Sequence, residues 1–139
     1  MIEARFGFTR CPFDKSLASR DLYLWPGLHE LEARLQMVKQ AKGILLLTGE
    51  PGTGKTAALR KFVDSLNLEH YLPVYLPLAT VTVLDAYAQL NRALGGEPLR
   101  SKSLLFREIQ QGVAQLAAQG KMPVVILDEA DLLRSALFD

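Results

Sequence analysis

A glycine-rich octapeptide constrains what this chain can fold into more than any other feature. Residues 49–56 read Gly-Glu-Pro-Gly-Thr-Gly-Lys-Thr, a glycine and four residues before Gly-Lys-Thr. Glycines let the backbone wrap closely around a phosphate, and successive N–H groups with the dipole of a following helix present positive charge to it. The motif requires a strand before it and a helix after it, and the flanking residues fit both. It therefore predicts a phosphate-binding loop rather than a plain turn.

The residue types in this loop predict how it binds a nucleoside triphosphate, with ATP the expected ligand. Lys55 is expected to reach the β- and γ-phosphates and to act in catalysis, and the Thr56 hydroxyl is expected to ligate Mg²⁺. The predicted nucleotide-binding residues are Gly49, Glu50, Pro51, Gly52, Thr53, Gly54, Lys55, Thr56 and Ala57.

A second candidate site follows the apolar run 123–127, where Asp128 and Glu129 end a predicted strand. Open α/β sheets keep their ligands at the carboxyl ends of strands. Asp128 is expected to hold Mg²⁺, and Glu129 is expected to polarise the attacking water as general base. Alone, two acids after an apolar run are equally typical of a solvated strand end. The loop at 49–56 favours the functional interpretation.

Helical and strand patterns alternate along the chain. The apolar runs 44–48, 71–76 and 123–127 predict strands, the first of them covered on both faces. Because proline cannot donate to a ladder, Pro73 predicts that the second strand lies at a sheet edge. This order predicts an α/β fold, the three-layer sandwich of a P-loop nucleoside triphosphatase with a mostly parallel sheet. Apolar residues at helical spacing mark four helices: Leu28, Leu31, Leu35 and Val38 before Gly43; Leu59, Phe62, Val63 and Leu66; Val83, Tyr87, Leu90 and Leu94 before Gly95; and Leu105, Ile109, Val113 and Leu116 before Gly120.

Composition limits the classes of protein that remain. The net charge of +1 provides no global field that would attract nucleic acid or a membrane. The single cysteine, Cys11, excludes an internal disulfide and fits a reducing compartment. No run reaches the roughly 18 apolar residues of a membrane helix, and the N-terminus lacks a secretory signal. These features predict a cytoplasmic protein without membrane insertion. Residues 1–25 are rich in aromatics and are expected to form an irregular arm, its aromatic side chains buried, over a domain at 26–139.

Five segments fall in a recognisable order: Phe6-Gly7-Phe8, Pro12-Phe13, the loop 49–56, Tyr75-Leu76-Pro77-Leu78 and Leu127-Asp128-Glu129-Ala130. In that order the chain resembles the AAA+ ATPases of the secretion-ATPase-A and transposition-helper group. Only the two nucleotide motifs are specific for this resemblance by themselves. The aromatic start and the Tyr-Leu-Pro-Leu segment narrow the resemblance to this subgroup of AAA+ ATPases.

The resemblance implies an ATP-dependent homo-oligomer that helps a transposase engage target DNA, while related members energise secretion. It also implies that the arm around Pro12 and Phe13 covers the adenine, and that the loop with Arg100 and Lys102 faces DNA. From the residues alone, Arg100, Lys102 and Arg107 are more typical of a solvated face.

The sequence departs from that group after the acidic strand. The group continues with a fourth strand bearing a polar sensor, a fifth strand, an arginine finger and a helical lid, none of which precedes Asp139. In the family's sheet the fourth strand lies between the loop strand and the acidic strand. An incomplete AAA+ core without it leaves backbone N–H and C=O groups of both neighbours unpaired. Each unpaired buried group costs roughly 1–3 kcal/mol. Direct pairing of the two strands, a segment from another copy, or truncation of a longer protein would each explain this; truncation is preferred.

Three functions remain open. The first is an ATP-binding module of an AAA+ ATPase that assists DNA transposition, with weak or no hydrolysis by this chain alone, because a missing arginine finger is worth about 10³–10⁵ in rate. The second is a non-catalytic module in which nucleotide binding orders an oligomer or recruits a partner. The third is the ATPase of a secretion system.

Overall fold

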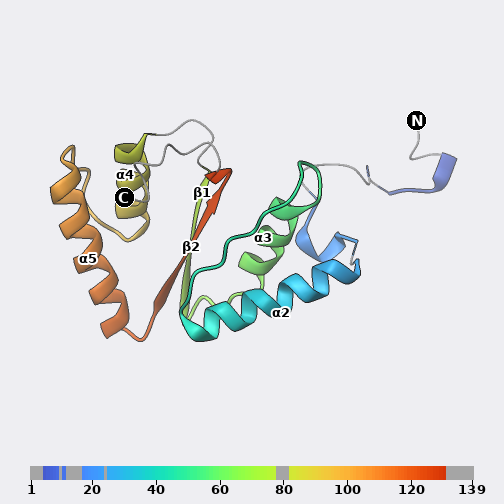
Figure 1. Cartoon of the computed structure of the whole chain (residues 1–139), viewed down its shortest axis with the longest axis horizontal. Helices are drawn as coiled ribbons and strands as arrows, with labels where there is room; N and C mark the ends of the chain where they lie inside the picture. The colour runs from blue at the N-terminus through green and yellow to red at the C-terminus, as the bar shows by residue number, and fades with distance from the viewer. Residues whose placement is uncertain (1–4, 10, 12–16, 24, 78–81, 131–139) are drawn as a thin grey trace. The chain divides into compact units, whose positions relative to one another are not determined.

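The computed structural model describes residues 5–9, 11, 17–23, 25–77 and 82–130. Two compact units make up the chain, Met1–Ser65 and Leu66–Asp139. The elements of the first are the 3-10 helix η1 (Ser19–Asp21) and helices α2 (Pro26–Ala41) and α3 (Lys55–Asp64). Those of the second are β1 (Tyr71–Pro77), α4 (Val83–Ala93), α5 (Lys102–Ala118) and β2 (Met122–Asp128) (Figure 1).

Helix α2 begins and ends where the sequence predicts. Pro26 stands in its first turn, where the missing N–H has no intrahelical partner to lose. Leu28 and Leu35 are buried, as their helical spacing predicts. At the other end Lys42 adopts the left-handed conformation, with φ of 52°, and the N–H of Gly43 donates to the carbonyl of Val38 at 3.0 Å. The backbone closes the helix there and turns toward the loop.

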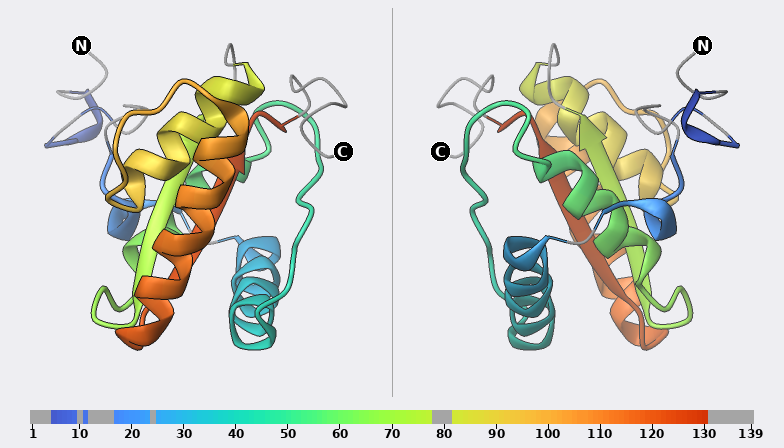
Figure 2. Two further views of the ribbon diagram at one scale, coloured as in Figure 1. Left: turned by 90° about the vertical axis from the view of Figure 1, so that its left-hand side faces the viewer. Right: turned by 90° about the vertical axis from the view of Figure 1, so that its right-hand side faces the viewer.

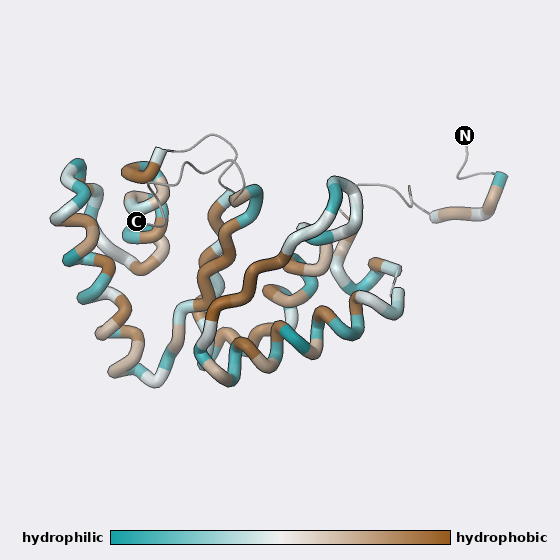
Figure 3. Tube along the Cα trace, in the orientation of Figure 1, coloured by the Kyte–Doolittle hydropathy of each residue, from teal (hydrophilic) through white to brown (hydrophobic). Residues whose placement is uncertain are grey.

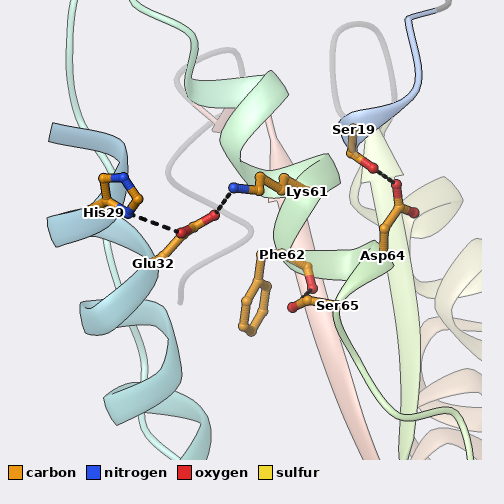
Figure 4. A network of polar contacts seen from close by, with 7 residues as sticks. All are labelled: Ser19, His29, Glu32, Lys61, Phe62, Asp64 and Ser65. Carbon is orange, nitrogen blue, oxygen red and sulfur yellow. Dashed lines mark hydrogen bonds and ion pairs between the residues drawn. The ribbon is translucent and has the colours of Figure 1, made fainter. Parts of the chain in front are cut away.

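Polar contacts fix α3 to its neighbours within the first unit (Figure 4). The Lys61 ammonium lies 2.5 Å from the Glu32 carboxylate on α2, and both side chains are less than one-third exposed. On the other side, the Ser19 hydroxyl of η1 donates to the carboxylate of Asp64. Phe62 of α3 is buried. The helix that follows the glycine-rich loop is therefore tied to α2 and to η1 by side chains.

The segment 44–48 differs from its prediction. It forms no strand, and Ile44 and Leu46 are 99% and 82% exposed, so the prediction of a strand covered on both faces was wrong. Figure 3 shows this apolar stretch leading from α2 to the loop before α3. A strand needs a neighbour for its N–H and C=O groups, and the sheet in the described part of the chain contains only β1 and β2.

The N-terminal aromatics are also placed differently from the prediction. Phe6, Phe8 and Tyr23 are 64%, 44% and 81% exposed, so their predicted burial was wrong. The two phenylalanine rings instead stack on each other, with centroids 5.9 Å apart. Such a pair shields part of each ring from water without a core beneath it. Pro12 and Phe13 lie outside the described residues.

The second unit contains a parallel strand pair. β1 and β2 pair in register from Tyr71 opposite Met122 to Pro77 opposite Asp128. Parallel pairing, with helices connecting the strands, confirms the predicted α/β class. Among the residues that the structure describes, the strand with Pro73 is paired on one side only, as its missing N–H predicts.

Helices α4 and α5 lie side by side over one face of this strand pair (Figure 2). Val74 and Leu76 of β1 pack with Ala86 of α4 in a buried cluster, bordered by half-buried leucines from β1, α4 and β2. Alternate residues of β1 are buried in this way because successive side chains of a strand point to opposite faces. No helix in the described part of the chain is long and apolar enough to cross a bilayer.

Candidate nucleotide-binding site

The glycine-rich loop curls around the ammonium group of Lys55. The Nζ atom donates to the carbonyl of Gly49 at 2.7 Å and to that of Glu50 at 2.8 Å. The Glu50 carbonyl also accepts from the Thr53 hydroxyl at 2.8 Å and from the Thr53 N–H at 3.4 Å. Two carbonyls and a tight turn thus hold the ammonium group of Lys55 against the loop backbone.

Two glycines in this loop adopt a backbone conformation that other residues rarely take. Gly52 and Gly54 have φ of 81° and 86°. A side chain at Gly52 would meet nothing within 4 Å, so only the backbone requires glycine there. A Cβ at Gly54 would lie 2.8 Å from a ring carbon of Trp25, so a replacement there would strain the backbone and also require the indole to shift. The sequence pattern predicted these glycines for close approach to a phosphate, and the positive φ adds a second reason for glycine at both positions.

Helix α3 begins immediately after the second of these glycines. Gly54 is its N-cap and supplies no side-chain cap, and its first turn, which includes Lys55, Thr56 and Ala57, carries no acidic residue. The first turn of an α-helix leaves its N–H groups without intrahelical acceptors and bears a partial positive charge. Backbone donors and a lysine ammonium are therefore concentrated at one helix end, a donor set that fits the oxygens of a phosphate.

A cavity of about 250 Å³ adjoins this helix start within the first unit. Its lining includes Trp25, Gly54 and Lys55. Arg34 and Glu30 also line it and are joined by a 2.6 Å contact between guanidinium and carboxylate. The loop thus borders a hollow with aromatic and charged walls.

The acidic pair belongs to the second unit. The Asp128 carboxylate accepts a hydrogen bond from the Tyr75 hydroxyl of β1, and its other oxygen accepts from the N–H of Glu129 at 3.0 Å. Glu129 has φ of 58°, a left-handed conformation that is uncommon outside glycine. Backbone strain at non-glycine residues concentrates at functional sites.

Sequence reasoning did not find Tyr75 as a neighbour of Asp128. Its position in the Tyr-Leu-Pro-Leu segment served only to sharpen a resemblance. In the parallel register Tyr75 stands opposite Ile126, two residues before Asp128. Since side chains alternate between faces, residues two positions apart share a face. The register between β1 and β2 would have identified Tyr75 as this neighbour, and no local sequence pattern contains that register.

The two groups of predicted site residues stand in different units. Residues 49–57 form one continuous turn and helix start, whereas Asp128 ends β2 and Glu129 follows it. A magnesium ion shared by Thr56 and Asp128 stays a prediction. The described residues contain no cluster of three or more His, Cys, Asp or Glu side chains that would hold a metal by itself. Mg²⁺ usually binds one or two protein ligands together with phosphate oxygens, so a complete protein cage is not required.

The residues expected to face DNA lie at the junction between the loop before α5 and the start of that helix. Lys102 lies over the ring of Tyr87, with Nζ 5.8 Å from the ring centroid, and Arg100 is exposed. A cation over an aromatic face gains some electrostatic attraction. Contact with DNA stays a prediction.

The fold and the loop define the class of protein. A model of the AAA domain matches residues 38–139, which include the loop, α3 to α5 and both strands. The chain belongs to this family, and it has the α/β fold of a P-loop nucleoside triphosphatase.

Two curated proteins are similar over most of this chain. Cell division control protein 48 homolog B of Arabidopsis thaliana is 34% identical over 116 residues, which cover 84% of this chain and 16% of that protein. General secretion pathway protein A of Aeromonas hydrophila is 32% identical over 131 residues, which cover 92% of this chain and 24% of that protein. The chain therefore spans a quarter or less of the length of each of these two relatives. No solved structure matches it.

Proposed function

We propose that this chain binds ATP with Mg²⁺ through the loop 49–56 and the start of α3. One observation carries the proposal: the loop wraps the Lys55 ammonium, which donates to the Gly49 and Glu50 carbonyls, directly beside the first turn of α3. This arrangement places a full positive charge and a helix N-terminus together, where a polyphosphate gains most from both.

The roles of individual residues follow from this arrangement. Lys55 and the backbone from Gly52 to Ala57 bind the phosphate oxygens. The Thr56 hydroxyl and the Asp128 carboxylate hold Mg²⁺, which supplies positive charge to the phosphates when it is bound. Glu129 acts as the general base that activates the attacking water. Membership of the AAA domain family supports nucleotide binding by the chain.

Isothermal titration calorimetry with Mg-ATP tests the proposal. The wild-type chain is expected to bind, and Lys55→Ala is expected to lose affinity by about 10- to 150-fold, because a hydrogen bond to a charged group contributes about 1.5–3 kcal/mol. Lys42→Ala removes an exposed lysine outside the loop and is the matched control. Equal affinities of Lys55→Ala and the wild type would overturn the proposal.

The same chain separates an ATPase from a module that only binds nucleotide. Phosphate release is measured for the wild type and for Glu129→Gln at saturating Mg-ATP. A rate that falls in the variant assigns turnover to Glu129. Two equal rates at the background level support a non-catalytic module, in which nucleotide binding orders an oligomer or recruits a partner.

For the biological setting, we propose that the chain works within a secretion or DNA-transposition assembly as a homo-oligomer in the cytoplasm. The similarity to general secretion pathway protein A over 92% of the chain favours secretion. The resemblance of the motifs to transposition helpers favours DNA and a transposase as partners. Affinity for duplex DNA that falls steeply with salt would support transposition, and its absence would support secretion.

A further inference from the structure

Trp25 lies directly on the glycine-rich loop. A Cβ built on Gly54 would meet its ring carbons Cη2 and Cζ2 at 2.8 and 3.4 Å, so the indole lies against the N-cap residue of α3. One built on Gly27 would lie 3.0 Å from the indole nitrogen. The ring therefore contacts both glycines, and a side chain at either position would require the ring to shift. It is nevertheless half-buried rather than buried.

The indole also forms a wall of the cavity beside the loop. Leu31 and Leu47 add apolar surface to this cavity, while Arg34, Thr48 and Lys55 add polar groups. Mostly apolar walls with a few polar groups are typical of small-molecule sites. The volume of about 250 Å³ is smaller than the roughly 300–1,000 Å³ of sites that enclose a drug-sized ligand. The cavity suits one ring system rather than a whole nucleotide.

We propose that Trp25 is the stacking surface for the base of the nucleotide whose phosphates the loop binds. This inference rests on the proposed nucleotide-binding function. An indole offers a flat π-face, and every nucleobase has one to stack on it. Lys55 borders both the loop and the cavity, so a ligand with phosphates at the loop has its remaining atoms beside Trp25. The Arg34–Glu30 pair provides donors and acceptors at the cavity wall for ring nitrogens or a ribose.

The experiment compares two probes on the full 139-residue chain: Mg-ATP, which has a base, and Mg-tripolyphosphate, which has none. Trp25→Ala is expected to lower the affinity for Mg-ATP by about 5- to 150-fold, because stacking of one base on an aromatic residue is worth about 1–3 kcal/mol. Its affinity for tripolyphosphate is expected to stay within twofold of the wild type. Trp25→Phe is expected to restore most of the ATP affinity. Tyr23→Ala removes a nearby aromatic that is 81% exposed and does not line the cavity, so it is the matched control.

Fluorescence gives a readout that needs no variant, because Trp25 is the only tryptophan of the chain. Mg-ATP is expected to quench its emission, and Mg-tripolyphosphate is expected to change it little. The inference is overturned if Trp25→Ala lowers the affinity for both probes equally, which would make the indole only a support for the loop. It is also overturned if Trp25→Ala lowers the affinity for neither probe, or if Mg-ATP leaves the tryptophan emission unchanged. Failure of the wild type to bind either probe would instead overturn the proposed function.

Discussion

The hydroxyl of Tyr75 donates a hydrogen bond to the carboxylate of Asp128 across the parallel pair of β1 and β2. Asp128 is the proposed ligand for Mg²⁺, and its other oxygen accepts from the N–H of Glu129. Each carboxylate oxygen thus has a neutral donor that sets its orientation. Tyr75 is the residue that holds the proposed metal ligand in place.

Tyr75→Phe is expected to weaken the magnesium dependence of nucleotide binding. Loss of a partner that orients a metal ligand typically costs 10- to 100-fold in metal affinity or activity, so the Mg²⁺ concentration at half-maximal ATP binding is expected to rise about tenfold. ATP binding without Mg²⁺ is expected to be unchanged. Tyr87→Phe, on α4, controls for the loss of a tyrosine hydroxyl elsewhere in the same unit. An unchanged magnesium dependence would contradict the positioning role.

Gly54→Ala is expected to lower the melting temperature more than Gly52→Ala. Both replacements place a side chain at positive φ, which costs about 1–2 kcal/mol. Only the methyl group at position 54 would also approach Trp25 to 2.8 Å, whereas position 52 has open space. Combining Gly54→Ala with Trp25→Ala is therefore expected to recover part of the loss. Equal melting temperatures of the two single variants would show that the indole moves aside without cost.

Thr82 and Asp85 should make the start of α4 sensitive to acid. The Thr82 hydroxyl and N–H donate to the Asp85 carboxylate, and they hold the pKa of Asp85 below its usual value of 3.8. A lowered pKa in the folded state stabilises the protein above pH 3.8, and the stabilisation is lost as the pH falls through the folded-state pKa. The urea midpoints of wild type and Asp85→Asn are therefore expected to differ at pH 6 and to converge near pH 2.

Two variants complete that comparison. Thr82→Ala is expected to cost about 1 kcal/mol at neutral pH, as the loss of an N-cap residue usually does. Glu69→Gln removes an exposed carboxylate outside the capping box and is expected to show no such convergence. A constant difference between wild type and Asp85→Asn at all pH values would rule out the capping box as the acid-sensitive element.

Leu46→Lys is expected to reduce self-association without loss of stability. Leu46 is 82% exposed in an apolar segment without ladder hydrogen bonds, and unpaired apolar segments of this kind promote association between chains. A surface replacement usually changes the free energy of unfolding by no more than about 0.5 kcal/mol. Light scattering against protein concentration measures the first effect and urea unfolding the second. A marked loss of stability would show that the segment is packed in solution, and Leu45→Lys, at a half-buried position, shows the size of such a loss.

Local chemistry allowed much of this molecule to be predicted from the sequence. Gly52 and Gly54 were identified because a backbone that wraps closely around a phosphate leaves no room for side chains, and both glycines also have positive φ. The helix at Pro26 was predictable because proline fits a first turn and leucines recur on one face. Pro73 predicted an edge strand because a missing N–H removes a ladder bond wherever the strand lies.

Contacts between distant residues decided the rest. The run 44–48 has the composition of a buried strand, yet a strand exists only beside a neighbour, and the sheet in the described residues consists of β1 and β2 alone. The approach of Trp25 to Gly54 depends on how the chain returns after the whole of α2. The bond from Tyr75 to Asp128 depends on the register of a pair whose strands are separated by two helices. Backbone preferences depend on adjacent residues, so the sequence alone determines them. The three relationships above depend on contacts between distant residues, which form only when the chain folds.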